Sequence, residues 1–163
     1  MILLPVPHIW RYITIVQTPT RNYSAFDYKI LFEKAKIEDG YARFVLANNM
    51  TGKLIPPGVD TTNIYSTGLN TPIKLVYSKE GFDEKPKIIY GDGDGQVILR
   101  SLSDDIGNWK QTNGGREFKE YVIQNVHHME IIKSKVYVNK VIKLLTQRDF
   151  SHSTSDKSAL NHN

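Results

Sequence analysis

No cysteine occurs in the 163 residues of this chain, so disulfides, thiolate nucleophiles and cysteine-based zinc sites are excluded. Long hydrophobic runs are missing as well, and no segment reaches the length of a transmembrane helix. Residues Met1–Pro7 are apolar but too short for the core of a signal peptide. We therefore expect a soluble chain without a recognisable export signal in the residues shown, and its compartment stays unknown.

A strong excess of charge of one sign is also lacking. The chain has 21 lysines and arginines against 17 aspartates and glutamates, and the two signs are interspersed. No basic stripe therefore points to a nucleic-acid partner. A hydrophobic content of 40% and a charged content of 23% are those of a globular chain and not of a disordered one. This length fits one ordinary domain.

The local patterns predict an α/β fold. Ser24 and Asp27 have the spacing of a capping box ahead of an apolar run, which predicts a helix start. Short β-branched or aromatic runs follow, separated by Gly, Pro, Asn and Asp. We expect strands at 13–16, 61–65, 73–77, 86–90 and 118–126, and further helices at about 38–48 and 129–146. We assign 1–148 to one domain and expect 149–163, which are polar, to form a disordered tail.

The most informative segment is Ile88–Val97. An apolar run there ends in Gly91-Asp92-Gly93-Asp94-Gly95, where glycines alternate with carboxylates, and apolar residues then resume. Glycine tolerates backbone conformations that other residues avoid. The pattern is therefore typical of a strand that delivers one carboxylate to the tip of a tight loop.

Several interpretations of this loop can be weighed. A calcium loop of the EF-hand kind is excluded, because positions five and twelve counted from Asp92 are Gln96 and Ser103. A phosphate-binding loop is excluded because its glycine and lysine patterns are missing. No metal-ligand pattern surrounds His127 and His128, so we expect neither a metal nor a cofactor. A plain surface turn, together with a structural histidine, stays open as the simpler interpretation.

The remaining interpretation is a catalytic triad. A triad needs a carboxylate that receives the Nδ1 hydrogen of a histidine, fixes its tautomer and stabilises the imidazolium. In α/β-hydrolases this acid follows a late strand, and the histidine follows the last strand. The chain has the same order, with Asp94 after the strand expected at 86–90 and His128 after the strand expected at 118–126. Asp94 and His128 are therefore the candidate acid and base.

The same residues resemble the lecithin:cholesterol acyltransferase family, which includes lysosomal phospholipase A2, plant acyltransferase-like proteins and phospholipid:diacylglycerol acyltransferase. Tyr90–Val97 resembles the family's YGDGDGTV motif, although Gln96 stands where the family usually has Thr. His128–Ile131 resembles the segment that holds the family's catalytic histidine.

Two upstream segments extend this resemblance. Residues 18–27 resemble the start of a cap-region helix in the family, and residues 57–72 resemble its PGV…LYGTG…TP stretch. The similarity covers roughly residues 18–145 in order. Residues 63–68 and 81–83 resemble the plant members of the family most.

The resemblance implies that Asp94 is the triad acid, His128 the triad base and Asp92 a loop-forming neighbour. It implies the C-terminal part of an α/β-hydrolase fold, with a piece of the cap region and an incomplete central sheet. It also implies an O-acyltransferase or phospholipase of lipid metabolism, in which a serine takes a fatty acyl group from a glycerophospholipid. The acceptor would be a sterol, another hydroxyl compound or water. Contact with a membrane surface is left open.

One absence limits that chemistry. No Gly-x-Ser-x-Gly occurs in the sequence, so the nucleophile serine and the oxyanion donors of the family are not in these residues. We expect the chain to be inactive alone, as a truncated product or an incomplete gene model, or to be completed by a separately encoded half. The alternative is a non-catalytic lipid-binding or interaction protein derived from the fold. An unrelated small α/β domain is a third interpretation.

Overall fold

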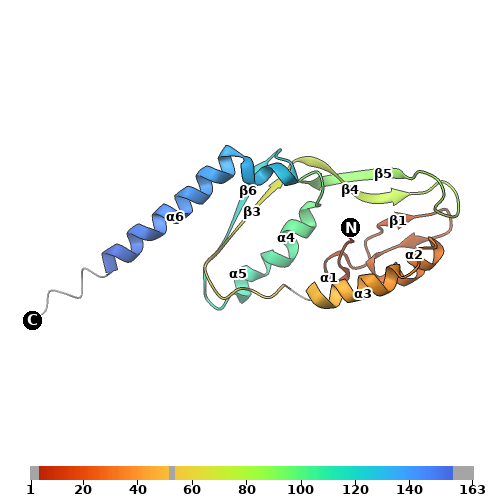
Figure 1. Cartoon of the computed structure of the whole chain (residues 1–163), viewed down its shortest axis with the longest axis horizontal. Helices are drawn as coiled ribbons and strands as arrows, with labels where there is room; N and C mark the ends of the chain where they lie inside the picture. Colours follow the sequence, from red (N-terminus) through yellow and green to blue (C-terminus); the bar gives the residue numbers. More distant parts are fainter. Residues whose placement is uncertain (1–3, 52–53, 156–163) are drawn as a thin grey trace, which may run out of the picture.

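The structure is a computed structural model that describes residues 4–51 and 54–155. Helices and strands are mixed along the chain in an α/β arrangement (Figure 1). The strands are β1 (Val16–Gln17), β2 (Asn22–Tyr23), β3 (Thr61–Thr67), β4 (Leu69–Val76), β5 (Lys87–Gly93) and β6 (Phe118–Gln124). The helices are α1 (Pro7–Trp10), the 3₁₀ helix η1 (Ala25–Asp27), α2 (Tyr28–Lys34), α3 (Gly40–Thr51), α4 (Leu99–Gly107), α5 (Trp109–Thr112), the 3₁₀ helix η2 (His128–Lys133) and α6 (Lys135–Ser155).

A four-stranded sheet forms one part of the molecule. Its strand order is β2-β1-β4-β5, and β1 pairs with β4 in parallel while the other two pairs are antiparallel. The main hydrophobic core lies beside this sheet and the helices α1 and α2. Its buried members are Trp10, Ile15, Val16, Tyr23, Ala25, Tyr28 and Phe32. Most apolar burial therefore belongs to the N-terminal half of the chain and to the sheet that it joins.

The predicted capping box is confirmed and starts the first long helical segment. The Ser24 backbone N–H donates to the Asp27 carboxylate at 2.8 Å, and the Ser24 hydroxyl accepts from the Phe26 N–H at 3.3 Å. These bonds satisfy N–H groups that have no partner inside a helix. The segment then continues from η1 into α2, whose Tyr28 and Phe32 are buried.

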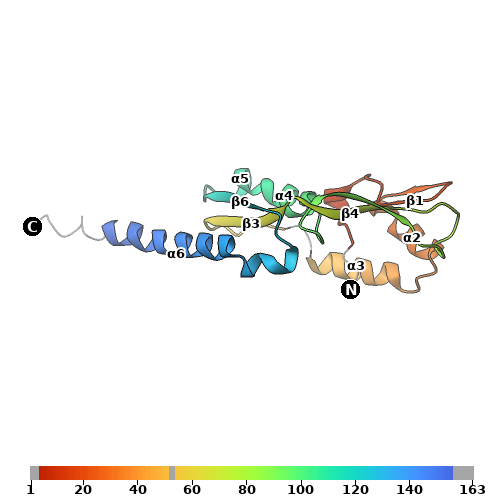
Figure 2. The same cartoon turned by 90° about the horizontal axis from the view of Figure 1, so that it is seen from above.

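A second sheet consists of β3 and β6. The two strands pair in parallel, from Thr61 opposite Phe118 to Thr67 opposite Gln124, so both end at the same edge. A parallel pair needs a long crossover, and here the crossover contains the β4–β5 hairpin, α4 and α5. In Figure 2, α4 and α5 lie on one side of this sheet and α6 lies on the other.

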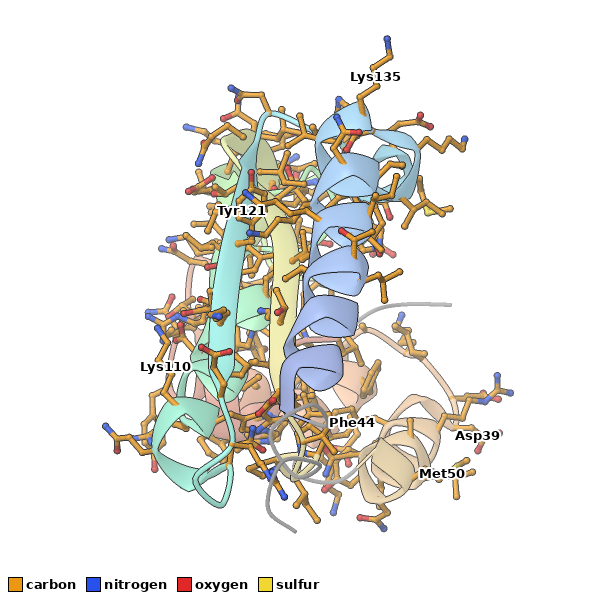
Figure 3. The ribbon with its side chains drawn as sticks, turned by 90° about the vertical axis from the view of Figure 1, so that its left-hand side faces the viewer. Asp39, Phe44, Met50, Lys110, Tyr121 and Lys135 are labelled. Atoms are coloured by element: carbon orange, nitrogen blue, oxygen red, sulfur yellow. The ribbon has the colours of Figure 1, made fainter. Side chains whose placement is uncertain are left out.

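The helix expected at about 129–146 is divided in two. After η2, Ser134 adopts an extended conformation, and its hydroxyl accepts from the Tyr137 N–H at 3.2 Å, which starts α6 as a new helix. The amine of Lys140 lies 4.3 Å from the ring centroid of Tyr121 on β6, and Figure 3 shows Tyr121 beside the helix. Beyond this contact α6 extends away from the body (Figure 1).

α6 ends at Ser155, so part of the segment expected as a tail, 149–163, belongs to the helix, and the rest of that segment lies outside the described residues. Within the described residues, no helix combines the length and the apolar character needed to cross a membrane.

Candidate functional site

The acidic loop is a tight turn at the end of β5. Gly93 and Ile98 form a β-bridge, and the Asp94 N–H donates to the Val97 carbonyl at 3.1 Å. Gly93 is needed for space, because a Cβ there would lie 2.3 Å from the Val97 carbonyl oxygen. Gly95 is needed for its backbone, whose φ of +91° is strained for residues with a side chain. The expected strand followed by a tight loop is therefore present. Gly93 is required because of close contacts, and Gly95 because of its positive φ.

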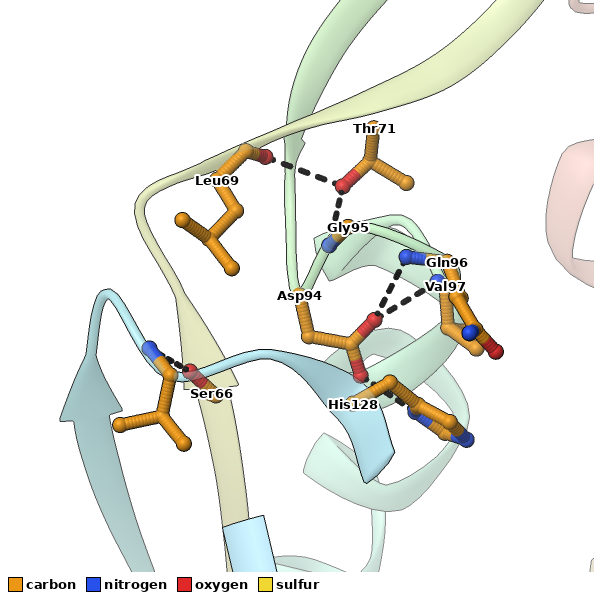
Figure 4. Close-up of polar contacts among 9 residues, drawn as sticks. Ser66, Leu69, Thr71, Asp94, Gly95, Gln96, Val97 and His128 are labelled. Atoms are coloured by element: carbon orange, nitrogen blue, oxygen red, sulfur yellow. Dashed lines mark hydrogen bonds and ion pairs between the residues drawn. The ribbon is translucent and has the colours of Figure 1, made fainter. Parts of the chain in front are cut away.

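The Asp94 carboxylate is buried in this turn and fixed by it. The residue is 4% exposed. Its Oδ1 accepts from the Gln96 N–H at 3.1 Å and from the Val97 N–H at 2.7 Å (Figure 4). A buried charge needs such partners to offset the loss of water. Because both bonds fall on Oδ1, the second oxygen is left to face the end of β6.

His128 occupies that position. Its Nδ1 lies 2.7 Å from Asp94 Oδ2, and its backbone N–H donates to the Asp94 carbonyl at 3.0 Å. The Asp94 side chain is 5% exposed and the His128 side chain 38%, so the imidazole is partly open to solvent while the carboxylate is buried. Because an ionised carboxylate can only accept, a neutral imidazole in this contact carries its hydrogen on Nδ1 and has its lone pair on Nε2. A neutral imidazole held in this tautomer can take a proton from a hydroxyl group.

The neighbouring candidates have different surroundings. The exposed His127 precedes η2, and its Nδ1 would lie 2.9 Å from a Cβ on Gly95. Asp92 accepts from the Thr67 hydroxyl at 2.6 Å and from the Gly68 N–H at 2.7 Å. These bonds lower the pKa of Asp92 below its ordinary value. They tie β5 to the β3–β4 turn, while Asp94 is the carboxylate that meets a histidine.

One contact of the loop is not visible in the sequence patterns. Thr71 on β4 is 0% exposed, and its hydroxyl oxygen accepts from the Gly95 N–H at 2.9 Å. In the sequence Thr71 is the threonine of the TP pair in the family-like stretch 57–72, but that resemblance gives the residue no role. A polar residue in a strand-like run is ordinarily assigned to the exposed face of a strand.

No serine hydroxyl among the described side chains is hydrogen-bonded to His128. Ser66, which is 1% exposed, accepts instead from the Val126 N–H at 3.1 Å. The described residues also include no group of three or more His, Asp or Glu side chains that could hold a metal ion. The arrangement can therefore orient the imidazole of His128.

Comparison with known proteins finds similarity to proteins named as phospholipases and acyltransferases. Lysosomal phospholipase A and acyltransferase of Rattus norvegicus is 41% identical over 102 residues, which are 61% of this chain and 24% of the relative. Lecithin-cholesterol acyltransferase-like 1 of Arabidopsis thaliana is 35% identical over 138 residues, 81% of this chain and 29% of the relative. Phosphatidylcholine-sterol acyltransferase of Mus musculus is 31% identical over 111 residues, 66% of this chain and 25% of the relative.

The chain is related to the lecithin:cholesterol acyltransferase family. The relationship concerns the C-terminal portion of that family. No family model matches the chain. It spans about a quarter of the length of the relatives that it matches. The lecithin:cholesterol acyltransferase relationship thus confirms the resemblance read from the motifs, while the roles of single residues stay predictions.

Proposed function

We propose that this chain supplies the acid and the base of a serine acyl-transfer site in an O-acyltransferase or phospholipase of lipid metabolism. The observation that carries the proposal is the 2.7 Å contact between His128 Nδ1 and Asp94 Oδ2. In this proposal His128 Nε2 takes the proton of a serine hydroxyl, and Asp94 stabilises the imidazolium that forms.

The proposed reaction has two steps. The serine oxygen attacks the ester carbonyl of a glycerophospholipid, and His128 passes the proton to the departing lysophospholipid hydroxyl. A sterol hydroxyl, another alcohol or water then attacks the acyl-serine, and His128 acts again as base and acid. The names of the relatives, phospholipase A and acyltransferase and phosphatidylcholine-sterol acyltransferase, support this substrate class.

We further propose that the fold is the C-terminal part of an α/β-hydrolase and that a second polypeptide segment completes the site. Among the described strands, β3 pairs with β6 alone, so its other edge can accept a strand. A two-stranded sheet is also too small to be stable by itself. The segment that binds there would carry the nucleophile serine and the oxyanion donors.

Exposed apolar side chains on η2 and α6 favour a second candidate function, that of a non-catalytic lipid-binding or interaction protein. Met129 is 65% exposed, Ile132 64% and Leu145 62%. Lysines 133, 135, 140 and 143 accompany them. Apolar residues and lysines on these two consecutive helices suit contact with the surface of an anionic membrane.

A complementation experiment tests the main proposal. The chain is mixed with the separately produced remainder of the Arabidopsis relative, and acyl release from phosphatidylcholine vesicles is measured. We expect activity only in the mixture, and a loss of about 10⁴-fold on Asp94→Asn, the size seen when a triad acid is removed. His128→Ala should also abolish activity, whereas the matched control His127→Ala should retain it.

Two results would decide against this proposal. One is a mixture without activity although the two polypeptides bind each other. The other is activity that His128→Ala leaves unchanged. If the chain floats with anionic vesicles but never supports acyl release, and if Asp94→Asn does not alter flotation, the second candidate function is favoured.

A further inference from the structure

Thr71 connects the acidic loop to β4 through a hydroxyl to which the sequence analysis gave no role. Its Oγ1 accepts from the Gly95 N–H at 2.9 Å and donates to the Leu69 carbonyl at 3.0 Å (Figure 4). The residue is 0% exposed, so no water can replace either partner. The hydroxyl therefore forms a fixed connection between the start of β4 and the middle of the loop.

The loop shows why this connection matters for Asp94. Three successive N–H groups follow the acid, and those of Gln96 and Val97 both donate to Asp94 Oδ1. The first of the three, on Gly95, is turned away from the carboxylate and donates to Thr71. With Oδ1 occupied by two donors, Oδ2 is the oxygen that faces His128.

Gly93 shows how closely the loop approaches this threonine. A Cβ on Gly93 would lie 2.6 Å from Thr71 Oγ1, closer than real side chains come. The loop is therefore seated directly against the hydroxyl. A change in Thr71 would act on the conformation of the loop before it acted on the body of the sheet.

We propose that Thr71 is a positioning residue, which holds the acidic loop so that Asp94 Oδ2 meets His128 Nδ1. Its effect passes through Gly95, because its hydroxyl bonds to the Gly95 N–H and the Leu69 carbonyl. The catalytic meaning of this role rests on the proposed function, whereas the geometric effect does not. In a completed enzyme, a displacement of the acid by about 1 Å is expected to lower turnover about 10²-fold.

The test uses nitrogen NMR of the His128 ring in the full chain, because the ring nitrogens report which one carries the hydrogen. The wild type and Thr71→Ser should show the Nδ1–H tautomer, with a protected Nδ1 hydrogen. Thr71→Val, which keeps the shape but removes the hydroxyl, should lose that signature while the remaining backbone amide signals persist. Thr61→Val is the matched control, because its hydroxyl bonds to the Val59 carbonyl at the far end of β3, and it should leave His128 unchanged.

A second pair of variants decides the matter if Thr71→Val does not fold. Thr71→Ser and Thr71→Ala both lack the methyl group and differ from each other only in the hydroxyl. The proposal requires that Ser keeps the His128 signature and that Ala loses it. An unchanged signature in Thr71→Val or Thr71→Ala, or its equal loss in Ser and Ala, would overturn the positioning role.

Measurements on the completed enzyme separate this inference from the proposed function. Thr71→Val should lower kcat about 10²-fold with little change in KM, and Thr71→Ser should restore it. A Thr71→Val mixture as active as wild type would overturn the positioning role and leave the acid–base assignment intact. If no mixture releases acyl groups but the NMR result is as expected, the proposed function is wrong and the positioning role of Thr71 stands.

Discussion

Replacing Gly93 by alanine places a methyl group where the structure has no room for one. The new Cβ would lie 2.3 Å from the Val97 carbonyl oxygen, 2.6 Å from Thr71 Oγ1 and 2.9 Å from Ile98 Cα. Two of these three atoms belong to the backbone and cannot rotate away. Relief therefore requires the loop itself to move, which weakens the 3.1 Å bond from the Asp94 N–H to Val97.

The size of the effect follows from this geometry. Overpacking of a well-packed site costs about 1–3 kcal/mol, and because two of the three close contacts are with backbone we expect a loss of at least about 2 kcal/mol for Gly93→Ala. A loss of about 2 kcal/mol changes the folding equilibrium by a factor of about 30. With a urea dependence of about 2 kcal/mol per molar, the midpoint of unfolding should fall by about 1 M. Urea unfolding followed by circular dichroism measures this shift.

Gly107→Ala is the matched control for this substitution. Gly107 is the last residue of α4, and a Cβ there has nothing within 4 Å. Because alanine is a better helix former than glycine by about 0.5–1 kcal/mol, this variant should be as stable as the wild type or slightly more so. Equal midpoints for Gly93→Ala and Gly107→Ala, with the His128 ring signals intact in both, would refute the reasoning.

Three further substitutions test the helix cap at Ser24, the contribution of Asp92 to stability at low pH, and the packing of α6. Ser24→Ala should reduce the free energy of unfolding by about 1 kcal/mol, since it removes a helix cap, and an unchanged urea midpoint would contradict this. The pKa of Asp92, lowered by the Thr67 hydroxyl and the Gly68 N–H, is below its unfolded value. Its stabilisation is therefore present above about pH 4 and is lost as the pH falls through the folded value. The difference in stability between wild type and Asp92→Asn should accordingly shrink at low pH in urea titrations, and a constant difference would argue against it. Ile142, 53% exposed on α6, should tolerate Ile142→Ser within about 0.5 kcal/mol, and a larger loss by thermal unfolding would indicate a packed helix.

Local patterns were the best guides to the fold. The capping box of Ser24 and Asp27 works through bonds within a few residues, so the sequence alone predicted it correctly. The strands near residues 61–65, 73–77, 86–90 and 118–126 are also present, as β3, β4, β5 and β6. The strand expected at 13–16 is reduced to Val16–Gln17, because only these residues find partners in the sheet.

Other elements depend on contacts that a single sequence does not display. The short helix α1 is held by the Trp10 indole N–H, which donates to the Ser101 hydroxyl at 3.0 Å across the fold. The break between η2 and α6 was missed because the apolar spacing continues through it, although Ser134 carries a capping signal. For the site, Asp94 and His128 could be named from motif and order. The contribution of Thr71 depends on the path of β4, which periodicity does not give.

The parallel pairing of β3 with β6 has a consequence for how the molecule acquires its native shape. Parallel partners far apart in the chain must wait for a long loop to close, and such contacts form slowly compared with turns and helices. His128 can contact Asp94 only after β6 has paired with β3, whereas the turn around Asp94 can form without that pairing. We expect the NMR signature of the His128–Asp94 contact to form late in refolding, after the hairpin that carries Asp94. A chain trapped before β3 and β6 pair would have the acidic loop in place but no contact between Asp94 and His128.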